Sequence, residues 1–342
     1  MQLGIVLSTA VNAILPILLL ILLGFWLRKT GFLTGEFAKV ANKFVFRVGL
    51  SCSLFLNVYN IPDLSAIPWN FVAYVVIVIC LLFCMGLFAA VATTKLPQRR
   101  GAIVHAIFRS NFAIIGLPLA AALGGEAASS VASVVSAFAM PLYNVLGVFA
   151  LTIFDHDPYS GKTSSKRIVM SIVKNPMILG AFFGLVCLLL REGQGLLWGR
   201  TIFSIKQHLP FVYKTVDNLK VVTSPLALIV LGAQFEFSAV RGMFKEITVG
   251  SLLRIVFAPL LGIGGAVLLS RYTSLLDCGV NEFPTLIALF GSPAAVSTAV
   301  MAAEMGSDDQ LATQIVVWTS IGSVITIFLT ACILMSVGLL AM

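Results

Sequence analysis

Long stretches almost free of charged side chains constrain the fold of this chain more than any other feature. The first, from Ile5 to Leu27, contains no Asp, Glu, Lys or Arg. A helix needs about 20 apolar residues to cross the ~30 Å hydrocarbon layer of a membrane. Of the 342 residues 59 % are hydrophobic and 11 % are charged, against roughly 25 % charged in soluble domains. The sequence therefore predicts an all-α membrane protein.

Breaks that contain charged residues, Gly or Pro divide the chain into ten predicted transmembrane helices. We interpret the first as a retained helix, because no basic residue precedes it as in a cleaved signal peptide. The predicted spans are 5–27, 37–58, 70–93, 101–122, 129–153, 169–190, 212–235, 247–270, 284–303 and 310–340.

Basic residues are distributed unequally between the loops, which predicts an orientation by the positive-inside rule. With the N-terminus outside, both termini lie outside, and the short loops are typical of a bacterial inner-membrane protein. The inner loops then hold Arg28, Lys29, Lys95, Arg99, Arg100, Lys162, Lys166, Arg167, Lys174, Arg241 and Lys245, and the outer loops hold Arg191, Arg200, Lys206 and Arg271.

Composition and spacing exclude several classes of function. The net charge of +8 comes from scattered residues rather than the clustered basic patch that nucleic acid requires. His105, His156 and His208 are far apart and lack metal-ligand spacing. Because a nucleophile elbow and paired carboxylates are also missing from the motifs, we expect no enzyme, no cofactor, no metal and no nucleic-acid partner.

The two halves of the chain resemble each other on either side of the polar linker Asp155–Lys174. A shift of 182 positions aligns them without a gap, and five spans in each half give the halves opposite polarity. We therefore predict inverted repeats over 1–160 and 161–342, an architecture typical of secondary transporters. The aligned pairs are Phe108 with Phe290, Ser110 with Ser292, Gly124 with Gly306, Glu126 with Asp308, and Val134-Val135 with Val316-Val317.

The fourth and ninth predicted helices carry polar residues, Gly and Pro at mid-span. The fourth contains Gly116 and Pro118, and the ninth contains Pro293. Because proline removes a backbone donor and clashes with the preceding turn, we expect these crossover or hinge positions to interrupt both helices. The N-terminal ends of half-helices present unpaired amides that suit a carboxylate. The pattern predicts an anion site.

Four segments of the sequence resemble the auxin efflux carrier family, which includes plant PIN-FORMED proteins and bacterial relatives. Together they cover most of the chain: Asn111 to Pro118, with Pro seven residues after Asn; Lys174-Asn175-Pro176; Pro225-Leu226-Ala227-Leu228 through Gly232; and Ser292-Pro293-Ala294-Ala295-Val296 through Glu304. In two places the chain departs from plant members. Ser110 stands where they have the crossover proline, and their long cytosolic loop is reduced to Asp155–Lys174.

The resemblance implies a fold similar to sodium/proton antiporters and bile-acid symporters. It implies a scaffold of helices 1, 2, 6 and 7, a mobile unit of helices 3–5 and 8–10, elevator-type movement, and a homodimer formed through the scaffold. By that similarity Asn111 binds the substrate carboxylate, Pro293 marks the second crossover, and Tyr143 and Asn144 face the site.

Other polar residues in the spans have two interpretations. Arg47, Arg109 and Arg254 either supply positive potential to an anion, or they snorkel or pair with broken-helix carbonyls. Ser110, Ser292 and Ser297 either contact the substrate or bond back to their own helix. His105 is predicted to pack in the core, with proton coupling as the alternative.

Three functions remain open at this point. The first is a uniporter or efflux carrier for a small organic carboxylate, driven by its gradient and the membrane potential. The second is a sodium- or proton-coupled symporter on the same fold, since unwound carbonyls also hold cations. The third is a membrane sensor that binds a ligand without moving it.

Overall fold

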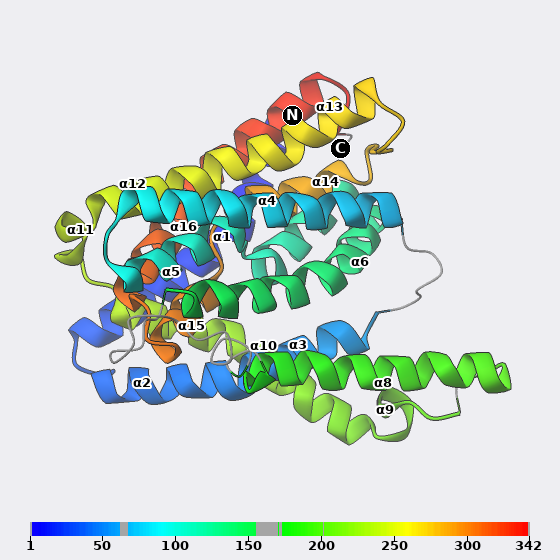
Figure 1. Ribbon diagram of the computed structural model, residues 1–342, viewed down its shortest axis with the longest axis horizontal. Coiled ribbons are helices and arrows are strands. Elements are labelled where there is room, and N and C mark those ends of the chain that lie inside the picture. The colour runs from blue at the N-terminus through cyan, green and yellow to red at the C-terminus, as the bar shows by residue number, and fades with distance from the viewer. Residues whose placement is uncertain (1, 62–67, 155–169, 171–172, 201, 341–342) are drawn as a thin grey trace.

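A computed structural model describes residues 2–61, 68–154, 170, 173–200 and 202–340. The predicted repeat boundary at residue 160 and most of the linker lie outside these residues. Figure 1 shows helices connected by short loops. In this view α2, α3, α8 and α10 lie along the lower side, and α4, α12 and α13 lie along the upper side.

The described residues form α-helices and short π-helical segments, the latter labelled η. In chain order they are α1 (Gln2–Lys29), α2 (Gly35–Phe44), η1 (Val45–Gly49), α3 (Leu50–Tyr59), α4 (Trp69–Thr93), α5 (Pro97–Phe108), η2 (Phe112–Gly116), α6 (Leu117–Thr152), α8 (Pro176–Trp198), α9 (Ile205–His208), α10 (Pro210–Gln234), α11 (Ala239–Gly242), α12 (Phe244–Leu252), η3 (Leu253–Phe257), η4 (Leu260–Gly264), α13 (Gly265–Tyr272), α14 (Phe283–Leu286), η5 (Ile287–Gly291), α15 (Val296–Glu304) and α16 (Asp309–Ser336).

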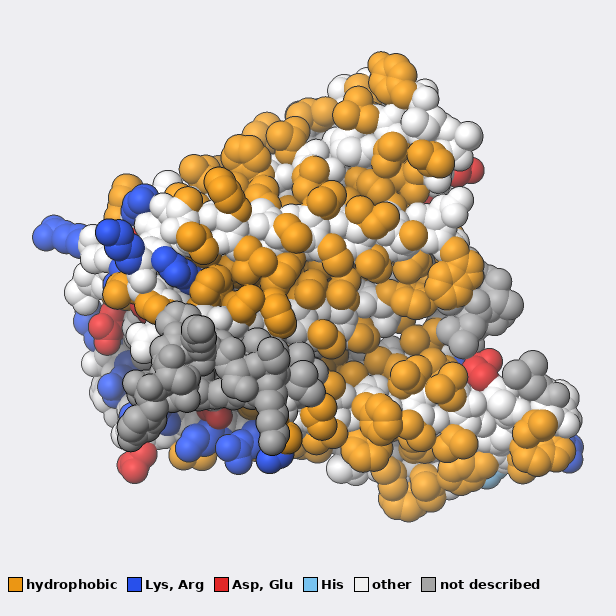
Figure 2. Space-filling view, in the orientation of Figure 1, with side chains coloured by type: hydrophobic (Ala, Val, Ile, Leu, Met, Phe, Trp, Pro, Cys, Tyr) orange, Lys and Arg blue, Asp and Glu red, His pale blue; other side chains and the backbone are white. Residues whose placement is uncertain are grey.

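Seven helical stretches of the described residues are long and apolar enough to cross a membrane. Hydrophobic side chains cover the middle of the face in Figure 2, and Lys and Arg gather at the end where α2 and α11 lie. One of the seven, Phe112–Thr152, contains Gly125 at φ +65°, where the helix direction is broken. A left-handed residue of this kind is readily adopted by glycine. The all-helical membrane fold is confirmed, whereas ten spans and inverted repeats stay predictions.

The sixth helix begins later than the predicted span 169–190. The Asn175 side chain accepts a hydrogen bond from the Met177 N–H, and Pro176 occupies the first turn. Both features start helices, since an N-cap side chain satisfies a free amide and proline at N1 needs no donor. The helix ends at Gly199, which has φ +66°, a common C-terminal conformation. These local signals were present in the sequence and outweigh the hydropathy pattern.

Two close helix pairs depend on glycine. In α1 and α10, a Cβ at Gly24 would lie 2.0 Å from the Ile229 carbonyl oxygen, and one at Gly232 would lie 1.9 Å from that of Ile21. In α8, a Cβ at Gly180 would lie 2.4 Å from the Ser51 carbonyl oxygen of α3, and one at Gly184 would lie 2.6 Å from that of Phe55. Small residues let helix backbones approach in this way. Gly180 and Gly184, four residues apart on α8, thus form a helix-packing motif.

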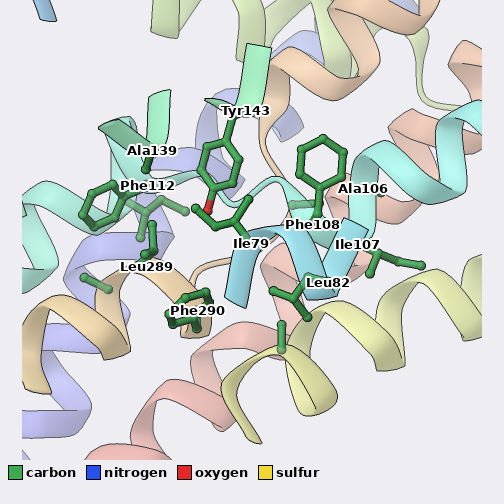
Figure 3. Close-up of a cluster of buried hydrophobic side chains, with 14 of the residues drawn as sticks. Ile79, Leu82, Ala106, Ile107, Phe108, Phe112, Ala139, Tyr143, Leu289 and Phe290 are labelled. Atoms are coloured by element: carbon green, nitrogen blue, oxygen red, sulfur yellow. The ribbon is translucent and has the colours of Figure 1, made fainter. Parts of the chain in front are cut away.

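The buried core surrounds the point where the fourth and ninth helical segments are interrupted. Figure 3 shows Ile79 and Leu82 of α4, Phe108 of α5, Phe112 of η2 and Tyr143 of α6 packed together with Leu289 and Phe290 of η5. All of these side chains are buried. The interruption therefore lies inside protein, where apolar packing keeps lipid away from it.

Candidate functional site

Two interrupted helical segments meet backbone to backbone at the centre of the structure. Helical structure stops after Phe108 and resumes at Phe112, and it stops again after Gly291 and resumes at Val296. The Asn111 N–H donates to the Pro293 carbonyl at 2.8 Å, and the Ala295 N–H donates to the Arg109 carbonyl at 3.1 Å. This antiparallel contact satisfies two pairs of backbone groups that the breaks release. Non-helical backbone inside a membrane requires hydrogen-bond partners of this kind for its N–H and C=O groups.

We call the point where the two interrupted segments meet the crossing. Arg254 of η3 lies on the side of the crossing where α5 and η5 end. It is fully buried, and its guanidinium donates five hydrogen bonds to backbone carbonyls at 2.8–3.4 Å, those of Ile107, Phe108, Leu289, Phe290 and Ser292. A guanidinium has five N–H donors, so all can be satisfied here. The C-terminal ends of two helices carry partial negative charge. The Arg254 cation therefore balances both ends at once.

On the other side of the crossing, where η2 and α15 begin, lies a cavity of about 80 Å³. Its lining includes the start of η2, at Asn111 and Ala113, and the start of α15, at Val296 and Ser297. The first N–H groups of a helix have no intrahelical acceptor and carry partial positive charge. At the crossing, the positive ends of the helix dipoles therefore face the cavity, and the negative ends face Arg254.

Asn111 lies in the crossing, lines the cavity and carries a hydrogen-bond donor that has no acceptor in the part of the chain that the structure describes. It is 3 % exposed and lines the cavity. Its backbone groups are bonded, but its side-chain Nδ2 has no partner among the described residues. A buried donor without an acceptor costs about 1–3 kcal/mol, so its presence in a native structure calls for an explanation.

Arg109 lies beside Asn111 and also lines the cavity. Its Nη2 donates to Asn144 Oδ1 at 2.9 Å, and its Nη1 lies 3.2 Å from His105 Nε2. Asn144 in turn donates to the Met140 carbonyl, which fixes its orientation. The described residues place no carboxylate in an ion pair with Arg109, so its charge contributes positive potential to the cavity.

Tyr143 and Asn144 lie behind the cavity wall rather than in it. The Tyr143 hydroxyl is 3.2 Å from Ser110 Oγ, and Figure 3 shows its ring beside Phe108 and Phe112. Neither Tyr143 nor Asn144 is among the lining residues, whereas Ser110 is. These two side chains orient Ser110 and Arg109 from the far side.

The other predicted site residues divide between the cavity and the crossing. Ser297 lines the cavity, and its hydroxyl has no hydrogen bond within the described part of the chain. Ser292 bonds back to the Ala288 carbonyl, and Pro293 accepts the Asn111 N–H, so both belong to the crossing.

Gly116 and Pro118 follow the first break instead of forming it. Gly116 lies in η2, and Pro118 lies in the first turn of α6. A Cβ on Gly116 would lie 2.9 Å from the Ala288 carbonyl oxygen, so this glycine permits close contact between η2 and η5. The break itself occurs at Arg109–Asn111, where tertiary hydrogen bonds replace helical ones.

The three intramembrane arginines have three different environments. Arg254 pairs with broken-helix carbonyls, as one of its two interpretations expected, and Arg109 lines the cavity. Arg47, in η1, is exposed and does not line the cavity, which fits the snorkelling interpretation.

The polar residues on the opposite cavity wall were not among those predicted from the sequence. Asn57 of α3, and Thr223 and Ser224 of α10, line it. Lys220, one turn before Thr223, donates from Nζ to Asn57 Oδ1 at 3.0 Å. A lysine inside the predicted span 212–235 was itself the signal, because charges within spans mark functional sites.

Two other features of the described residues do not suit a small anion or a metal. A groove of about 600 Å³ between α13 and α16 is lined by hydrocarbon side chains, with Thr326 and Thr330 as its polar residues. Such a surface is suited to lipid chains. No three His, Cys, Asp or Glu side chains in the described ranges form a group that could hold a metal ion.

Comparison with known proteins identifies the class. A family model described as "Membrane transport protein" matches residues 9–155 and 160–331. The chain belongs to this family of membrane transporters. The predicted resemblance to auxin efflux carriers is thereby confirmed, and the family is one of transporters rather than of enzymes. A Methanocaldococcus jannaschii protein described as an uncharacterized transporter is 23 % identical over 255 residues, 72 % of this chain and 76 % of that protein.

Replacing Arg254 with methionine should strongly destabilise the transporter. The substitution leaves five buried carbonyls without their donor, and each buried unsatisfied group costs about 1–3 kcal/mol. We expect the free energy of unfolding to fall by roughly 3 kcal/mol or more. The midpoint of thermal unfolding in detergent measures this change.

Arg47→Met is the matched control, because Arg47 is an exposed arginine of the same chain. We expect its effect to stay within about 0.5 kcal/mol. Equal unfolding midpoints for the two variants would contradict the structural role given to Arg254.

Proposed function

We propose that this multi-pass transporter carries a small organic carboxylate, which binds between the N-terminal ends of η2 and α15. The proposal rests on one observation: Asn111 Nδ2 is a buried, unpartnered donor in a cavity that two helix N-termini line. A carboxylate is an acceptor-only group with two oxygens. It can accept from Asn111, the Ser297 hydroxyl and free helix amides together.

Charge supports the choice of an anion over a neutral solute. The cavity is lined by Arg109 and by two positive helix ends. Helix N-termini stabilise anions by about 0.3–1 kcal/mol each, and by more where they are partly buried. A single water needs roughly 10–15 Å³ of such space, so a cavity of about 80 Å³ favours a substrate of a few carbon atoms.

Ten spans arranged as inverted repeats are part of the proposal. Gly125 divides the stretch Phe112–Thr152 between the proposed fourth and fifth spans, and three of the ten proposed spans are assembled from shorter pieces. These are α2–η1–α3, α5 with η2 and the start of α6, and α14–η5 with α15. The two breaks at Arg109–Asn111 and Ser292–Ala295 fall near the same place in the aligned halves. In this arrangement both termini lie outside the cell membrane.

We further propose an elevator-type movement of one bundle against the other. The static bundle consists of α1, α2–η1–α3, α8 and α10, and the mobile unit contains the crossing. Support comes from the position of the cavity between them, with Asn57 and Thr223 on one wall and Asn111 and Ser297 on the other. The family resemblance adds a homodimer formed through the static bundle.

We expect transport without a coupling cation. Arg254 already bonds the carbonyls between the half-helix C-termini, the groups that hold sodium in cation-coupled carriers. Among the described residues, no Asp or Glu lines the cavity to relay protons. The substrate gradient and the membrane potential then remain as driving forces.

Asn111→Ala should weaken substrate binding by about ten- to hundredfold, the effect of one hydrogen bond to a charged group. Calorimetric binding of a panel of small acids, including acetate, propionate, malonate and malate, measures it. Asn60→Ala is the matched control, because Asn60 is exposed, bonds Tyr213 and lies outside the cavity. Equal affinities of the Asn111→Ala variant and the natural protein would rule out this site.

Flux into liposomes at a clamped potential tests the coupling. We expect a potential of 100 mV, positive inside, to raise accumulation of a monovalent anion roughly fiftyfold, since it contributes about 2.3 kcal/mol per charge. Replacing sodium with choline, or removing the pH gradient, should leave the flux unchanged. Uptake that needs sodium or a pH gradient would identify a symporter instead, and binding without flux would identify a sensor.

A further inference from the structure

Lys220 places a second positive charge next to the cavity, on the wall opposite Arg109. It lies well inside α10, and Thr223, Ser224 and Ala227 continue the same face of that helix into the cavity lining. Residues three and four apart share a helix face. The Nζ of Lys220 is 3.0 Å from the side chain of Asn57, which also lines the cavity. Lys220 does not itself line the cavity, but its ammonium group lies one hydrogen bond away from a residue that does.

The hydrogen bond of Lys220 does not neutralise its charge. Its partner is the neutral amide of Asn57. The nearest carboxylate along the helix, that of Asp217, attracts Lys220 electrostatically but forms its ion pair with Lys214 at 3.7 Å, and no ion pair of Lys220 occurs in the described ranges. An ammonium group has three donors, so two remain for another acceptor. Charges kept inside membrane spans are costly and usually functional.

We infer that Lys220 is a specificity-determining residue that binds a second negatively charged group of the substrate. This inference rests on the proposed function. The first carboxylate lies at Asn111 and the helix N-termini, on the wall formed by the crossing. A second carboxylate that extends across the cavity meets Lys220 and the amide of Asn57. An acid with one carboxylate leaves Lys220 unused.

Malonate and propionate test this role, because both have three carbon atoms and differ in one carboxylate. Calorimetry with the purified full-length protein in lipid nanodiscs gives the affinity of each. We expect Lys220→Gln to weaken malonate binding about tenfold, the effect of one charge-assisted hydrogen bond, and to change propionate binding less than twofold. Lys220→Arg, which keeps the charge, should preserve most of the preference for malonate.

Lys214→Gln is the control variant, since Lys214 lies on the same helix but is 70 % exposed at its side chain. It should leave both affinities unchanged. If Lys220→Gln lowers the affinities for malonate and propionate equally, Lys220 only links α10 to α3, and the inference is overturned. An unchanged malonate affinity would overturn it as well. If the natural protein binds neither acid nor any other of the panel, the proposed function fails instead.

Discussion

The fold depends on satisfying the backbone groups that two interrupted helices release inside a membrane. In hydrocarbon each unsatisfied N–H or C=O costs several kcal/mol, so such breaks persist only within protein. Here the two breaks satisfy each other through the Asn111–Pro293 and Ala295–Arg109 bonds. Arg254 then satisfies the helix ends on one side. A buried core of aromatic and aliphatic side chains surrounds this crossing (Figure 3).

The same arrangement divides the crossing into two chemically different sides. One side has two negative helix ends, whose charge the Arg254 cation balances. The other has two positive helix ends, Arg109 and the unbonded side-chain Nδ2 of Asn111, and none of the described lining residues is a carboxylate. The proposed preference for an anion rests on this backbone geometry, and the side chains of Asn144 and Tyr143 bond the lining residues Arg109 and Ser110. Lys220, which bonds Asn57 of the facing wall, places a further positive charge beside the cavity.

Sequence patterns predicted the helical membrane fold, the two interruptions and the position of Asn111, because hydropathy, Gly, Pro and polar residues at mid-span act through local chemistry. They located the first break less well, since Pro118 suggested a kink while tertiary bonds placed the break at Arg109–Asn111. The role of Arg254 could not be chosen from two alternatives, because its five acceptors come from segments far away in the sequence. Lys220 was visible as a charge in a span, but its position at the cavity depends on how α10 packs against α3.

The most direct test is an experimental structure of the protein in a lipid nanodisc with a bound small carboxylate such as malonate. The account predicts carboxylate density within hydrogen-bonding distance of Asn111 Nδ2 and the first amides of α15, while Arg254 remains bonded to the carbonyls of α5 and η5. An anion bound elsewhere, or helices that run unbroken through residues 109–111 and 292–295, would contradict it.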